Sequence, residues 1–258
     1  MESSPTASDT TSAMRAEAEL LRQGYNDLPA GMGTTFLASS GLAWVVAESR
    51  YYPEAWLWLA IMGLLVAWRS VTIFLYRRDV RNPGRHKIWE KHFIAGAVLT
   101  GFGWGYASWV FYPLMGDLEL SLLILVIAGI TAGATRSLGP ILPACWTFQI
   151  LSLAPLIVRA LQAGAVAQTI MGVLAIFYAA FLIAMARSYH RSLYNSLRLG
   201  YESASLAEEL KEQQRQADAL NRGLSAEVAT AARSRPSFAP PRTAPSRPTR
   251  PRASSSRP

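Results

Sequence analysis

The stretch AIMGLLVAWRSVTIFLYRRDVRNPGRHKIWEKHFIAGAVLTGFGWG, residues 60–105, places a basic connection between two apolar runs. A helix of about 20 apolar residues is long enough to cross a bilayer. Basic connections between such helices stay on the cytoplasmic side. The stretch therefore predicts two membrane-spanning helices and their orientation. The basic residues of the connection are Arg77, Arg78, Arg81, Arg85, Lys87 and Lys91.

Apolar runs of similar length recur along the chain and predict an all-α integral membrane protein. The composition agrees, because 51% of the residues are hydrophobic and only 16% are charged, whereas soluble domains carry about 25% charged residues. We expect six transmembrane helices, at residues 30–47, 54–76, 92–112, 118–135, 141–159 and 165–186, forming one sensory domain over 28–186.

The polar N-terminal segment lacks the apolar core of a cleavable signal sequence. We expect disorder over residues 1–13 and a cytoplasmic juxtamembrane helix over 14–27. Asn26 or Asp27 is expected to cap the first spanning helix, with Pro29 in its first turn, where no amide hydrogen is needed.

The remaining charges place both termini in the cytoplasm. The connection after the third span is acidic, whereas Arg136 follows the fourth span and Arg187 and Arg191 follow the sixth. Aromatic residues typical of the membrane boundary lie at the opposite side: Tyr51, Tyr52, Trp56 and Trp58. The outer connections are too short for a sensing domain, so a stimulus would enter through the bilayer or a cavity among the helices.

Two kinds of residue inside the spans are informative. Arg69 lies within the second span, where a charge is costly and indicates function unless its side chain reaches the interface or a structural partner. Glycines lie four residues apart in the third and fourth spans, a spacing that lets helices approach closely in lipid. We expect helix packing at Gly101, Gly105, Gly129 and Gly133.

The sequence shows no catalytic apparatus, metal site or cofactor motif. His86, His92 and His190 have no spacing typical of metal ligands. Cys145, the single cysteine, lies in an apolar run and is interpreted as a small buried hydrophobe. The chain is therefore not expected to be an enzyme.

Residues 187–230 continue as a helix with a narrow apolar seam, interrupted at Gly200 and Gln213. Leucines recur in steps typical of a coiled coil, which predicts a parallel homodimer. An amphipathic helix lying on the membrane is the alternative, although such helices favour Lys and Arg on their polar face. The seam residues are Leu199, Leu206, Leu210, Leu220 and Leu224.

The chain resembles the membrane-embedded input region of bacterial sensor histidine kinases and of diguanylate cyclase or phosphodiesterase proteins. The resembling features are Leu28 with Pro29, residues 93–105, residues 128–134, Pro155 and, above all, SLRLGYESASLAEEL at 196–210. The resemblance implies a sensory module in the bacterial inner membrane that acts in signal transduction, including two-component systems. The alternative function is a small multi-pass transporter or channel.

In the resembling family the exit helix leads into a kinase, cyclase or similar output domain, which we do not expect in this chain. Residues 233–258 hold seven prolines, seven arginines and six serines, so a disordered tail is expected over 231–258. These arginines also account for most of the net charge of +8, which argues against nucleic-acid binding. The tail could contact anionic lipid or a protein partner, or it could result from a frameshift near Ala231.

Overall fold

The computed structural model describes residues 7–50, 53–79 and 85–234. Within these residues the chain is helical, without strands. The elements are α1 (Ala7–Arg50), α2 (Glu54–Asp79), α3 (His86–Phe111), the 3-10 turn η2 (Tyr112–Leu114), α4 (Asp117–Leu138), α5 (Leu142–Gln162) and α6 (Val166–Ser234).

Five of the described helices are long and apolar enough to cross a membrane, namely α1, α2, α4, α5 and α6. The predicted all-helical membrane fold is confirmed to that extent, but α3, which contains most of the predicted third span, is not among the five. Its 26 residues would reach across a bilayer. Its glycines, tryptophans and tyrosine lower its mean hydropathy, however, and eleven of its residues are buried inside the protein.

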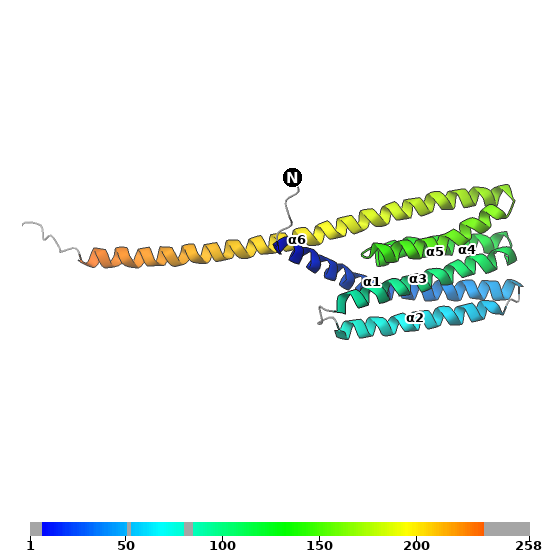
Figure 1. The fold of residues 1–258 in the computed structure, drawn as a ribbon, viewed down its shortest axis with the longest axis horizontal. Coiled ribbons are helices and arrows are strands. Elements are labelled where there is room, and N and C mark those ends of the chain that lie inside the picture. The colour runs from blue at the N-terminus through cyan, green and yellow to red at the C-terminus, as the bar shows by residue number, and fades with distance from the viewer. Residues whose placement is uncertain (1–6, 51–52, 80–84, 235–258) are drawn as a thin grey trace, which may run out of the picture. The chain divides into compact units, whose positions relative to one another are not determined.

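The first five helices pack side by side (Figure 1). Helix α1 lies against α2 and α4, α3 lies against α2 and α5, and α4 lies against α5. These contacts close the helices into a ring in the order α1, α2, α3, α5, α4. Short connections favour antiparallel neighbours, and consecutive helices of the five are neighbours in the ring except for α3 and α4, which α5 separates.

The closest helix pair is α3 with α5, and glycine permits its approach. A Cβ atom added at Gly101 would lie 3.0 Å from both Cα and the carbonyl oxygen of Phe148, and one at Gly105 would overlap the carbonyl oxygen of Leu151. Pro155 lies inside α5 and has no amide hydrogen to offer the carbonyl four residues earlier, that of Leu151. Gly105 therefore packs against a backbone oxygen that lacks its helical partner.

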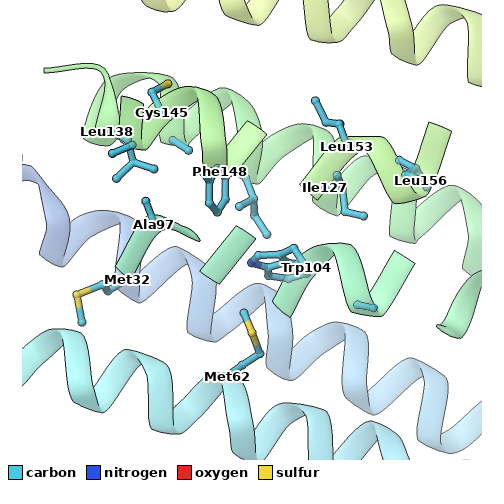
Figure 2. Packing of buried hydrophobic residues seen from close by; sticks show 14 of the residues in the cluster. Met32, Met62, Ala97, Trp104, Ile127, Leu138, Cys145, Phe148, Leu153 and Leu156 are labelled. Atoms are coloured by element: carbon cyan, nitrogen blue, oxygen red, sulfur yellow. The ribbon is translucent and has the colours of Figure 1, made fainter. Parts of the chain in front are cut away.

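Aromatic and sulfur-containing side chains fill the space around α3 (Figure 2). Trp104, Met62 and Phe148 are each at most 2% exposed. Trp58 is also buried, and its indole nitrogen donates to the carbonyl oxygen of Gly103 at 2.8 Å. The expectation that Trp58 lies at the lipid boundary is wrong; Trp56 is exposed, and Tyr51 and Tyr52 lie outside the described residues.

Helix α1 starts earlier than predicted and runs through Pro29. It includes residues 7–13, for which disorder was expected, and it joins the predicted juxtamembrane helix and first span into one element. Asn26 and Asp27 are inside this helix and do not cap it. The proline removes one backbone hydrogen bond, which commonly bends a helix, and Figure 1 shows α1 bent along its length.

Helix α6 is continuous from the last apolar span into the charged region that follows it. The chain divides into two units, residues 1–203 and 204–258. Within the first, Leu182 and Ala186 of α6 are buried and the Tyr178 hydroxyl donates to the carbonyl oxygen of Ala128. Within the second, the side chains described for α6 are exposed. The tail over 235–258 lies outside the described residues.

We expect substitution by alanine to have opposite effects in the two glycine pairs, Gly101 with Gly105 and Gly129 with Gly133. We expect Gly105→Ala to destabilise the protein by about 1–3 kcal/mol or more, since the new methyl group must push α5 away. Gly129, with nothing within 4 Å of an added Cβ, should tolerate alanine and gain up to about 1 kcal/mol of helix stability. Thermal unfolding of both variants in detergent measures the difference, and equal effects would contradict the packing described here.

Candidate functional cavity

A cavity of about 420 Å³ lies among the five ring helices. Its lining includes Met32 from α1, Val66 from α2, Thr100 from α3, Ile130 from α4 and Phe148 from α5. The volume lies in the range of small-molecule sites, which are mostly apolar with a few polar groups that orient the ligand. Because all five helices contribute, a ligand here would contact the whole ring.

The buried charge of this cavity is Arg69 of α2. Its side chain is 7% exposed, and its Nη1 donates to the Thr100 hydroxyl at a long 3.5 Å. Nη2 is buried without a hydrogen-bond partner. Within residues 7–50, 53–79 and 85–234, no carboxylate forms an ion pair with Arg69. The guanidinium is therefore buried without a negative charge, which is energetically unfavourable.

The neighbours of Arg69 leave room for its side chain but do not neutralise it. A Cβ atom at Gly96 would lie 2.9 Å from the Arg69 Nε, so glycine at this position accommodates the guanidinium. The ring of Phe93 has its centroid 5.9 Å from Cζ, within the distance of a weak cation–π contact. The Thr100 hydroxyl itself donates to the carbonyl oxygen of Gly96 at 2.7 Å, so it can accept from Arg69.

The remaining charges of the lining lie toward solvent. Arg136 of α4 is exposed and Asp27 of α1 is half-buried. Together with Arg69 they give the lining one net positive charge. Hydroxyl groups add hydrogen-bonding capacity, and those in the lining belong to Thr34, Thr35, Thr100 and Ser137.

Gly129 and Gly133 border this cavity and do not pack against another helix. An added Cβ atom at either position would have nothing within 4 Å. The packing interpretation, which the structure supports for Gly101 and Gly105, is therefore wrong for these two glycines within a single chain. Their lack of a side chain keeps space open along α4.

Sequence reasoning identified Arg69 but missed the residues around it. Thr100 lies 31 residues beyond Arg69 in sequence, and only the packing of α3 against α2 brings Thr100 and Gly96 to the guanidinium. The available signal was the density of small residues in α3, which was interpreted as helix packing alone. Arg136 was used only to assign orientation.

Two other hollows have different chemistry. One of about 410 Å³ lies between α4, α5 and α6 and is lined mainly by apolar side chains, including Leu125, Leu156 and Leu174, without a charged residue. A smaller one of about 180 Å³ is lined by residues that include His86 and His190. His190 Nδ1 lies 3.0 Å from the carbonyl oxygen of Pro140. The described residues contain no group of three or more His, Cys, Asp or Glu that could hold a metal ion.

The predicted seam residues of α6 are all exposed in the single chain. Their exposed fractions lie between 53% and 68% for Leu199, Leu206, Leu210, Leu220 and Leu224. Cys145 is fully buried, as predicted. His92 Nδ1 lies 2.9 Å from the carbonyl oxygen of Ile88 on its own helix.

The unneutralised charge at Arg69 predicts that removing it stabilises the protein. We expect Arg69→Met to raise the thermal unfolding midpoint, because one buried donor without a partner costs about 1–3 kcal/mol and methionine fits apolar surroundings. Arg187→Met is the matched control. That residue is exposed and lies over the ring of Trp146, so its loss should cost at most about 1 kcal/mol. A marked drop in the midpoint of Arg69→Met would show that the charge is structurally required.

No family model, curated protein or solved structure matches the chain.

Proposed function

We propose that the protein is a membrane-embedded sensory and dimerisation module of a bacterial signal-transduction protein. The observation that carries the proposal is the continuity of α6. A single helix begins as an apolar segment long enough to span a membrane and continues through residues 204–234. No turn or loop interrupts the helix between its apolar and charged parts. A movement of the apolar part could therefore be transmitted along the helix to the charged part.

The exposed leucines of α6 support the dimerisation half of the proposal. Large apolar side chains at heptad-like spacing, each more than half exposed, are typical of a helix that pairs with another. Charged residues surround them, including Arg198 and Glu202, whose side chains form an ion pair at 2.8 Å. We infer that a second copy of the chain covers these leucines in parallel orientation.

The cavity supports the sensory half. It lies among the five ring helices, so a molecule that enters it can change their packing without a separate extracytoplasmic domain. The signal would pass to α6 as a small shift or rotation relative to its partner. Such helix shifts are known two-state elements of switching proteins.

A transporter remains the alternative, and solute flux in proteoliposomes would favour it. The charged residues that line the cavity are two arginines and one aspartate. A proton relay built from paired carboxylates would need a second acidic residue. The sensory proposal expects ligand binding without flux.

Disulfide cross-linking tests the dimer. We expect Leu206→Cys and Leu210→Cys to form cross-linked dimers in membranes, since equivalent seam positions face each other across a parallel pair. Glu208→Cys is the control, because a residue two positions along an α-helix faces nearly the opposite side. The native Cys145 is buried and should contribute no background. Efficient cross-linking at 208 and none at 206 or 210 would contradict the proposed seam.

A further inference from the structure

We propose that the cavity at Arg69 binds a monoanionic amphipathic molecule, with a carboxylate or phosphate oxygen at the guanidinium and an apolar part along the helices. This binding does not depend on the proposed sensory function. If the protein is a sensor, the bound molecule would be its stimulus, and only that part rests on the proposed function.

The unpaired charge of Arg69 favours an anionic ligand. A buried guanidinium without an anionic partner is stabilised most effectively by a ligand that supplies the negative charge. Carboxylate and phosphate groups match arginine best, because its planar donors can bind two oxygens at once. Nη2 of Arg69 has no partner and Nη1 has only the long contact with Thr100, so both nitrogens have donor capacity left. Reaching Nη2 requires a small rotation of the side chain, since that atom is covered.

The net charge of the cavity lining favours a ligand with a single negative charge. Arg69 and Arg136 contribute two positive charges and Asp27 contributes one negative charge. A ligand with one negative charge would therefore neutralise the cavity, whereas a dianion would leave an excess. Asp27 and Arg136 lie nearer to solvent, so the ligand charge is most needed at Arg69.

The apolar side chains of the lining favour a ligand whose remaining part is apolar. The lining of the cavity includes Val66, Phe148, Met32 and Ile130, which offer contacts to an apolar chain. Gly129 and Gly133 of α4 border the cavity without a side chain, and a Cβ atom added at either would have nothing within 4 Å. The cavity therefore favours a molecule with an anionic head and an apolar body over a small inorganic ion.

This chemistry has two sources, a free amphipathic acid and the head group of a membrane lipid, and the experiment separates them. The full chain is placed in phosphatidylcholine nanodiscs and titrated with dodecanoate, dodecyl methyl phosphate (a diester with one negative charge) or dodecanol, with binding followed by calorimetry. A parallel sample contains phosphatidylglycerol in place of part of the phosphatidylcholine and is followed by its thermal unfolding midpoint. Dodecanol carries the same apolar chain without the charge.

We expect binding of at least one anionic probe, or stabilisation by phosphatidylglycerol, with dodecanol at least tenfold weaker. Binding of the free acids indicates a diffusible ligand, and an effect of phosphatidylglycerol alone indicates a lipid ligand. Arg69→Gln should weaken the affinity at least tenfold or abolish the lipid effect. Arg159→Gln is the charge-matched control, because that guanidinium lies over Trp109, away from the cavity, and it should bind as the native chain does.

A second pair of variants tests the cavity without changing its charge. Gly133→Leu places a side chain in open space beside the cavity and should abolish binding while the protein stays folded. Ala175→Leu fills the apolar hollow instead and should leave binding intact. The proposal is wrong if neither anion nor anionic lipid binds, if dodecanol binds equally well, or if Arg69→Gln and Arg159→Gln behave alike. Failure of the cross-linking experiment, by contrast, bears only on the dimer.

Discussion

The approach of α3 to α5 is the contact on which the helix ring depends. Burial of apolar surface provides little drive for helix association within a bilayer, because lipid tails are as apolar as the side chains they would replace. Close packing and polar contacts must hold the helices together. Gly105 lies against the carbonyl oxygen of Leu151, and Pro155 leaves that oxygen without its helical donor. A Cα–H contact to this oxygen is weak individually, yet it is available only because glycine lacks a side chain.

The same packing creates the surroundings of Arg69. Helix α3 contacts α2 on one side and α5 on the other, and small residues line the side facing α2. Gly96 leaves space for the guanidinium and Thr100 accepts one of its hydrogens. A larger residue at position 96 would exclude the side chain from this place. The arginine thus lies inside the protein because α3 has the small residues Gly96 and Thr100 beside it. The snorkelling interpretation does not fit a residue that is only 7% exposed.

The all-helical fold followed from the sequence because apolar runs of sufficient length have few other stable structures in a bilayer. The ends of the helices and the neighbours of each helix could be predicted less well from the sequence. Pro29 is compatible with either the first turn of a helix or its interior, and the local sequence does not distinguish the two. Trp58 is equally suited to a lipid boundary and a core, and only its hydrogen bond to Gly103 decides. Arg69 could be selected from its position alone, whereas its partner Thr100 lies 31 residues further along the chain.

Glycine spacing is the clearest example of a sequence pattern that does not determine which surroundings the residues have in the fold. Gly101 and Gly105 have the same spacing as Gly129 and Gly133, yet the first pair contacts a helix and the second borders a cavity. Gly129 and Gly133 lower the helix propensity of α4 and gain no packing within the chain in return. Such residues are expected where a functional demand opposes stability, and an unneutralised arginine in the wall of the same cavity is a second cost of the same kind. Two independent costs at one place are most simply explained by a ligand that offsets both, since its charge would pair with Arg69 and its body would fill the space beside α4.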